Sequence, residues 1–186
     1  MPSACVRASR THRCEAMPSE SARASSAAES RFRIDAPNSR PPVVKVVALD
    51  PPSEALAKRL EQDRWNRASF LTTSAFSAGR QPYGPFSMQA WLSDLSGRTT
   101  HLLQEIDGAD QVVMIATAGE SVPSAAIIGE ACSLKRVTTT ALIIGGDHAS
   151  DQALSSTVAQ LRPWALMVVV AGSDAYVADM LRALRA

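Results

Sequence analysis

The sequence predicts an α/β protein, a three-layer Rossmann-like open sheet of about five mainly parallel strands with helices on both faces. Short runs of apolar, β-branched residues recur between residues 43 and 186, and a segment of helical period follows each run. Apolar runs without polar alternation are typical of strands that are buried on both faces. Because strands alternate with helices, βαβ units are expected, each with a right-handed crossover.

Residues 1–42 differ in composition from the rest of the chain. Ser, Ala, Arg and Pro dominate, and the few apolar side chains show no period. Such a segment buries too little apolar surface to offset the entropy lost on ordering, so we predict a disordered arm over residues 1–42 and a single α/β domain over residues 43–186. Seven arginines and four acids give the arm a charge of +3; since the whole chain carries +1, the domain carries about −2.

Composition also bears on the compartment and the class of partner. A net charge of +1 provides no global field for nucleic acid, and no apolar run approaches the roughly 20 residues that span a bilayer. The N-terminus lacks the apolar stretch of a secretory signal; it resembles an organellar transit peptide in its Arg, Ser and Ala content, but its acids argue against that reading. The three cysteines predict neither a disulfide framework nor a zinc site, and Cys132 is expected to be a small buried residue. We therefore expect a soluble, cytoplasmic protein.

The first half of the domain has three predicted parts. A strand over residues 43–49 ends at Asp50-Pro51-Pro52, where Asp50 or Ser53 is expected to cap a helix whose apolar stripe extends to Trp65. Phe70 to Thr73 form a second, shorter strand. Apolar residues from Met88 to Ile106 have helical spacing that is interrupted at Gly97, which predicts two short helices or one kinked helix.

The second half alternates regularly. Three apolar runs predict strands, and each is followed by a segment of helical period. The predicted strands are residues 112–116, 139–144 and 166–171, and the predicted helices are residues 123–134, 151–161 and 175–184.

The loops after the strands are the places to look for a site. Ligands of open α/β sheets bind beyond the carboxyl ends of the strands, at a topological switch point. Short polar residues beside glycine lie there, and the ligand-binding candidates are Asp50, Gly119, Gly145, Gly146 and Asp174. Helix capping and turn formation explain the same residue types, and are the expected roles of Asp50, Ser53, Glu120, Ser121, Ser150, Ser173 and Asp174.

Asp147 and His148 are the candidates for catalysis, together with Glu120 from a loop that is expected to be adjacent. A histidine beside a carboxylate is able to act as a general base near neutral pH. Carboxylates at the strand ends are able to hold a divalent metal for hydrolysis or transfer. The alternative is a solvated loop histidine with no chemical role.

Several motifs are absent from the sequence. It has no G-x-G-x-x-G, no G-x-x-x-x-G-K-[ST], no G-x-S-x-G, no H-E-x-x-H and no spaced acidic metal loop. Asp50-Pro51-Pro52 occupies the turn where a dinucleotide-binding protein has glycines, and proline has no backbone N–H to donate. We therefore expect no cofactor and no dedicated metal site.

One stretch resembles a known family. Ala109 to Gly119, a helix beginning at Ala125 and the run Thr139 to Ile144 are similar to one part of the tubulin and bacterial cell-division GTPase family, in which an Ala-Asp strand ends in Ala-Gly and leads through a glycine-rich phosphate loop into a helix. Glu120-Ser121-Val122-Pro123 stands here in place of those glycines. The resemblance implies the layout of a nucleotide-binding domain, and no nucleotide or catalytic residue carries over.

Two classes of function follow from these patterns. The first is a non-catalytic accessory, regulatory or assembly subunit that binds a protein partner or self-associates. The second is a small metal-assisted hydrolase or transferase with its site at the carboxyl edge of the sheet. A sensor of a small ligand is a third, less supported interpretation.

Overall fold

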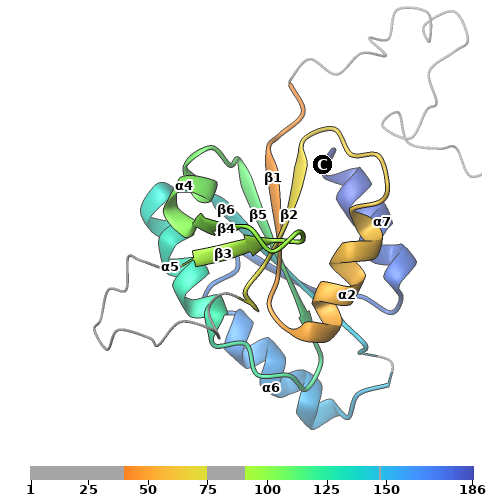
Figure 1. The fold of residues 1–186 in the computed structure, drawn as a ribbon. Helices are drawn as coiled ribbons and strands as arrows, with labels where there is room; N and C mark the ends of the chain where they lie inside the picture. The colour runs from red at the N-terminus through yellow and green to blue at the C-terminus, as the bar shows by residue number, and fades with distance from the viewer. Residues whose placement is uncertain (1–39, 75–90, 147) are drawn as a thin grey trace, which may run out of the picture. The chain divides into compact units, whose positions relative to one another are not determined.

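A sheet of seven strands in the order β4-β3-β2-β1-β5-β6-β7 organises the computed structural model, which describes residues 40–74, 91–146 and 148–186 (Figure 1). Numbered along the chain, the parallel strands have the order 2-1-3-4-5, one of the common doubly wound arrangements. The predicted Rossmann-like α/β class is confirmed. In sheet order, the parallel strands are β2 (Ala68–Thr72), β1 (Val44–Ala48), β5 (Gln111–Thr117), β6 (Thr138–Ile144) and β7 (Met167–Val170).

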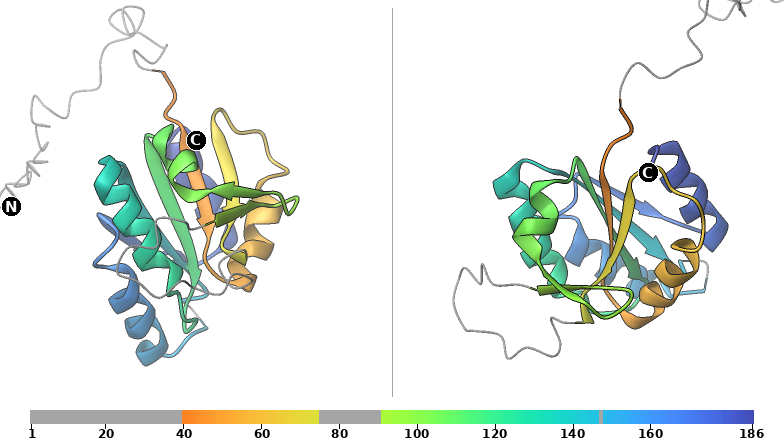
Figure 2. Two further views of the ribbon diagram at one scale, coloured as in Figure 1. Left: turned by 60° about the vertical axis from the view of Figure 1, so that its left-hand side comes forward. Right: turned by 45° about the horizontal axis from the view of Figure 1, so that its top comes forward.

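Helices lie on both faces of this sheet (Figure 2). One face packs against α2 and α7, and the other against α4, α5 and α6. The helix after β1 leads to a strand on one side of β1, whereas α5 and α6 lead to strands on the other side, so right-handed crossovers place them on opposite faces. The helices are α2 (Pro51–Leu60), α4 (Leu102–Asp107), α5 (Ser124–Lys135), α6 (Asp151–Leu161) and α7 (Asp174–Ala183).

The central strand β5 joins the two halves of the core. Residues 112–116 are all fully buried, and their side chains alternate between the faces. Val113 and Ile115 pack with the side chains of α2 and α7, whereas Met114 packs with those of α4, α5 and α6. The continuous apolar run therefore reads as a strand covered on both sides.

The predicted helical segment over residues 88–106 is largely wrong. β3 (Trp91–Asp94) pairs antiparallel with β2, and β4 (Thr99–His101) pairs antiparallel with β3, so the sheet has seven strands. Gly97 has φ +85 in the turn, and Asp94 accepts a hydrogen bond from the Arg98 backbone N–H at 2.7 Å. A glycine at positive φ between two short strands is typical of a hairpin. Only α4 retains the predicted helix.

The apolar stripe predicted for the first helix includes one residue, Trp65, that is not in the helix. The helix α2 ends at Leu60, and Trp65 lies beyond it. The Trp65 indole N–H donates to the Leu60 carbonyl oxygen at 2.7 Å, and its ring lies 5.9 Å from that of Phe70. Trp65 therefore packs over the end of α2 rather than along it.

Some predictions fall outside the described residues. These are the arm up to residue 39, the part of the predicted helical segment before residue 91, and Asp147. Within the described ranges, no helix has the length and apolar character needed to cross a membrane.

Candidate functional site

The carboxyl ends of β1 and β5 meet at the switch point of the sheet, where Asp50 and Thr117 lie side by side. Asp50 is only 7% exposed. Its Oδ1 accepts hydrogen bonds from the Ser53 backbone N–H at 2.8 Å and the Thr117 hydroxyl at 2.8 Å. Its Oδ2 accepts from the Thr117 backbone N–H at 2.7 Å. Burial of a carboxylate is tolerated when such donors surround it, and here both oxygens are bound by the chain itself.

A capping box explains why the sequence places Asp50 there. Asp50 is the N-cap of α2, and the Asp50 backbone N–H donates to the Ser53 hydroxyl oxygen at 3.1 Å. Pro51 and Pro52 occupy the first turn, where a backbone N–H has no helical partner. The expected capping roles of Asp50 and Ser53 are confirmed.

The loop after β5 is bound to α6. The Gly119 backbone N–H donates to the Thr157 hydroxyl at 2.9 Å, and the Val122 N–H donates to Gln160 Oε1 at 3.1 Å. Glu120 and Ser121 are exposed. Pro123 is the N-cap of α5 and no side chain caps that helix, so the capping roles expected for Glu120 and Ser121 are wrong.

The loop after β6 depends on its two glycines. Gly145 has φ +75, and its carbonyl oxygen accepts from the His148 N–H at 3.2 Å. A Cβ on Gly146 would lie 2.5 Å from Val170 Cγ1, so this position has no room for a side chain. The His148 side chain is exposed. Turn geometry and close packing therefore account for both glycines.

The loop after β7 carries a cap and an ion pair. Ser173 accepts from the Tyr176 N–H at 3.3 Å and caps α7, just as Ser150 caps α6 by accepting from the Ala153 N–H at 3.2 Å. Asp174 pairs with Arg59 of α2 at 2.6 Å, and both side chains are at least half exposed. The expected caps at Ser150 and Ser173 are confirmed, whereas Asp174 does not cap α7 and instead links the two helices of one face.

The candidates do not converge on a metal in the described part of the chain. Within it, no group of three or more His, Cys, Asp or Glu side chains is placed to hold an ion. β5 and β6 are neighbours, as expected, so the loops carrying Glu120 and His148 follow adjacent strands. The structure joins Asp50 to Thr117 and Ser53, and Asp174 to Arg59, rather than joining the candidates to one another.

Glu54 lies next to this edge, on the first turn of α2. Lys58 lies 2.7 Å from Glu54 Oε1, and the Thr72 hydroxyl donates to Oε2 at 2.8 Å. The Lys58 ammonium and then the Thr72 hydroxyl lower the pKa of Glu54 against the opposing effect of burial. The hydrogen bond between Glu54 and Thr72 joins α2 to the end of β2.

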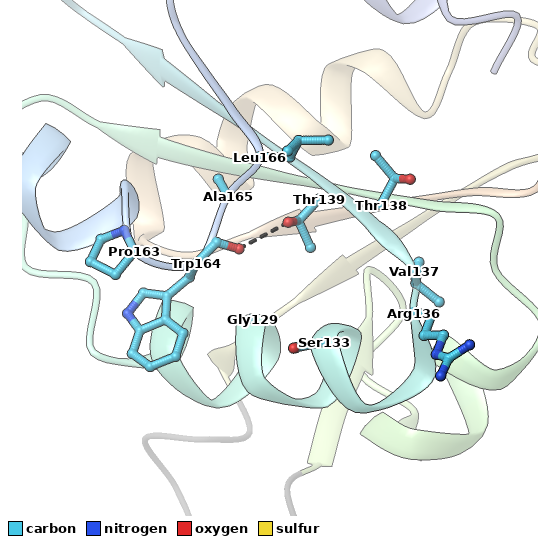
Figure 3. A pocket seen from close by; sticks show the side chains of 10 residues that line it. All are labelled: Gly129, Ser133, Arg136, Val137, Thr138, Thr139, Pro163, Trp164, Ala165 and Leu166. Carbon is cyan, nitrogen blue, oxygen red and sulfur yellow. Dashed lines mark hydrogen bonds between the residues drawn. The ribbon is translucent and has the colours of Figure 1, made fainter.

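A cavity of about 490 Å³ lies at the opposite, amino edge of the sheet (Figure 3). Trp164 stands at one end and Arg136 at the other, with the start of β6 between them. The Thr139 hydroxyl donates to the Trp164 carbonyl oxygen at 2.9 Å. No motif in the sequence predicted this cavity. Its lining comprises Gly129, Ser133, Arg136, Val137, Thr138, Thr139, Pro163, Trp164, Ala165 and Leu166.

The outermost parallel strand, β7, exposes apolar side chains next to this cavity. Leu166 is 83% exposed, Met167 43% and Val170 42%. The strand predicted over residues 166–171 is present as β7, and it has only β6 beside it in the described sheet. The exposed run is a feature that sequence reasoning missed.

Comparison with known proteins does not assign the chain to a family. No protein-family model matches the chain, and no curated protein matches it. What the fold defines is an α/β protein with a doubly wound, mostly parallel sheet. The resemblance to the tubulin and bacterial cell-division GTPase family stays a prediction.

Proposed function

We propose that this chain is a non-catalytic accessory, regulatory or assembly subunit that binds a protein partner. The observation that carries the proposal is the bonding of Asp50 to Thr117 at the switch point of the sheet. Ligands of doubly wound sheets bind at that point by using loop N–H groups and polar side chains. Here the carboxylate and the nearest N–H groups satisfy one another.

The neighbouring loops support the same conclusion. The Gly119 and Val122 N–H groups donate to Thr157 and Gln160 of α6. The hydroxyl groups of Ser150 and Ser173 accept from the first turns of their own helices. Polar groups that already have partners inside the chain must lose them before they bind a ligand, and each such loss costs about 1 kcal/mol.

The exposed edge of β7 supports a protein as the partner. Leu166, Met167 and Val170 are exposed and lie at this strand edge. Apolar side chains that are grouped on a surface are typical of protein interaction sites. A strand edge also offers backbone N–H and C=O groups to another chain.

Calorimetric titration of the full chain with Mg²⁺, Mn²⁺, Zn²⁺, ATP, GTP and NAD tests the non-catalytic part. We expect no binding at micromolar concentration. The matched control is the double variant Asp147→Asn/His148→Ala, which removes the catalytic candidates and is expected to behave like wild type. A metal that wild type binds at micromolar concentration and the variant does not would contradict the proposal and favour the metal-assisted hydrolase or transferase.

Affinity capture from the native source tests the partner-binding part. Bait proteins carrying Leu166→Lys and Leu134→Lys are compared, because both positions are large, apolar and exposed and only the first lies at β7. We expect a protein retained by wild type and by Leu134→Lys to be lost from Leu166→Lys. Equal capture by all three baits would argue against β7 as the binding surface.

A further inference from the structure

We propose that the cavity at the amino edge of the sheet binds a small carboxylate that carries an aromatic body. The aromatic part of the ligand lies against Trp164, and its carboxylate pairs with Arg136. A volume of about 490 Å³ is within the range of sites for small ligands. The inference goes beyond the proposed function, because a protein bound at β7 requires no small ligand.

The charge of the lining favours an anion. Among the described residues that line the cavity, Arg136 is the only charged one, and none is Asp or Glu. Arg136 has no ion pair within the described ranges, whereas its neighbour Lys135 pairs with Asp107. One guanidinium matches one carboxylate through two parallel N–H groups. It leaves most of the charge of a polyphosphate without a partner, so the site is suited to a monoanion rather than to ATP or GTP.

The turn that carries Arg136 is fixed by the backbone. Arg136 follows α5 with φ +57, the left-handed conformation in which glycine usually ends a helix. The Arg136 N–H donates to the Ser133 carbonyl oxygen at 3.2 Å, and the Val137 N–H donates to the Cys132 carbonyl oxygen at 2.9 Å. The base of the arginine side chain is therefore held in place at one end of the cavity (Figure 3).

The aromatic end of the cavity is held by close packing. A Cβ at Gly129 would lie 2.4 Å from Trp164 Cβ, so Trp164 approaches α5 this closely only because residue 129 has no side chain. The Trp164 carbonyl oxygen accepts from the Thr139 hydroxyl at 2.9 Å, and the Trp164 N–H donates to the Leu161 carbonyl oxygen at 3.0 Å. A tryptophan that is already fixed offers an aromatic surface at little further cost in entropy.

The helix α5 sets the distance between the two ends. Gly129, which lies against Trp164, and Arg136 are seven residues apart, which corresponds to about 10 Å along a helix. Ser133 lies between them on the same helix (Figure 3). 4-Phenylbutanoate, in which a short alkyl chain joins a phenyl ring to a carboxylate, has a comparable length and is a suitable probe.

The carboxyl end of α5 makes the site depend on one side chain. The last turn of a helix carries a partial negative charge, which disfavours an anion. The Arg136 guanidinium offsets this charge, and no second cation lines the cavity in the described part of the chain. Removal of Arg136 should therefore abolish the preference for an acid over a neutral molecule of the same shape.

Calorimetric titration of the full chain with 4-phenylbutanoate tests the site. We expect saturable binding with a dissociation constant of about 0.1 to 1 mM, the range usual for a ligand of this size. The alcohol 4-phenylbutan-1-ol lacks the charge and butanoate lacks the ring, and each should bind about tenfold more weakly or less tightly still. Absence of saturable binding, or equal binding of the acid and the alcohol, would overturn the proposal.

Two variants with the same change of charge test the role of Arg136. Arg136→Gln should weaken the binding of 4-phenylbutanoate about tenfold and leave that of the alcohol unchanged. Lys135→Gln is the matched control, because Lys135 is the adjacent exposed cation and does not line the cavity. It should bind the acid like wild type. Equal weakening by both variants would mean that overall charge attracts the acid, and the proposed contact would be wrong.

The indole N–H signals in proton–nitrogen correlation spectra locate the aromatic end. The chain has three tryptophans, and the single variants Trp65→Phe, Trp91→Phe and Trp164→Phe assign their signals. 4-Phenylbutanoate should shift the signal of Trp164 most, and Arg136→Gln should require a higher concentration of the acid for the same shift. A shift confined to Trp65 or Trp91 would place the acid elsewhere and overturn the inference.

Discussion

The Asp50 carboxylate accepts hydrogen bonds from both the backbone N–H and the hydroxyl of Thr117, at 2.7 and 2.8 Å, although the two residues are 67 positions apart in the chain. The same carboxylate caps α2 through the Ser53 N–H. One buried side chain therefore fixes the ends of β1 and β5 and the start of α2 relative to one another. Its structural role accounts for its position without a ligand.

Replacement of Asp50 by alanine should lower the free energy of unfolding by about 3 kcal/mol. The change removes an N-cap and leaves the Thr117 N–H and hydroxyl without their acceptor. Urea denaturation of the full chain measures the effect. Asp94→Ala is the matched control, because Asp94 accepts from a backbone N–H in an exposed turn and should cost at most about 1 kcal/mol. Equal losses for the two variants would contradict the structural role of Asp50.

Gly129→Ala should destabilise the protein by about 2 kcal/mol, even though alanine is the better helix former. A Cβ at this position of α5 would lie 2.4 Å from Trp164 Cβ and 3.1 Å from its Cα. Thermal or urea unfolding measures the change. Gly108→Ala is the control, since no atom lies within 4 Å of a Cβ there. A stabilising effect of Gly129→Ala would mean that α5 and the segment before β7 are not in contact.

The sequence predicts the parallel part of the sheet well for a physical reason. Central parallel strands are buried on both faces, so they leave uninterrupted apolar runs, and the helices between them have caps such as Ser150 and Ser173. The predicted helix over residues 151–161 coincides with α6 for this reason. Strand order, in contrast, depends on tertiary packing that no local pattern records.

The hairpin of β3 and β4 was missed because its apolar residues are ambiguous. Leu92 and Leu102 are both buried, one in a strand and one in a helix. Leu92 is nevertheless spaced from Leu95 as in a helical stripe, just as Leu102 is from Ile106. Gly97, with φ +85 in the turn, is the residue that distinguishes a hairpin from a helix here. A glycine in a helical pattern reads as an interruption, whereas the structure uses it to reverse the chain.

The candidate site was predictable only in part. Asp50 was identified as a cap from its neighbours in sequence, but its bonds to Thr117 cross the sheet and follow from strand order. The exposure of Leu166 and Val170 was not predictable, because an edge strand and a central strand have the same apolar run. Which strand lies at the edge is decided by the topology as a whole.

Cys132 should not react with thiol reagents in the folded protein. It is fully buried, as the sequence predicts, and burial raises its pKa to about 12, so almost no thiolate forms near pH 8. Mass spectrometry of the peptide containing Cys132 after iodoacetamide treatment, in native buffer and in urea, measures the modification. Labelling at Cys132 is expected only in urea. Rapid labelling under native conditions would show that α5 opens from the sheet.

The pH dependence of stability should contain a contribution from Glu54. Its pKa is lowered in the folded state by Lys58 and then by Thr72, so the folded state favours the ionised form more than the unfolded state does. The contribution is therefore fully present above the unfolded pKa, which is about 4.5, and is lost as the pH falls through the lower, folded value. Because the ion pair between Glu54 and Lys58 is partly exposed, its contribution to the free energy of unfolding should not exceed about 1 kcal/mol.

Comparison of wild type with Glu54→Gln by urea unfolding between about pH 3 and pH 7 tests this sign, the range being chosen to bracket the ordinary pKa of a glutamate. The difference in the free energy of unfolding should be constant at neutral pH and shrink below about pH 4.5. Lys58→Met should reduce the same difference at neutral pH, because it removes the larger cause of the lowered pKa, whereas Lys135→Met, in an exposed pair on the other face, should leave it unchanged. A difference between wild type and Glu54→Gln that grows toward acid pH would mean that burial, rather than Lys58 and Thr72, governs the ionisation of Glu54.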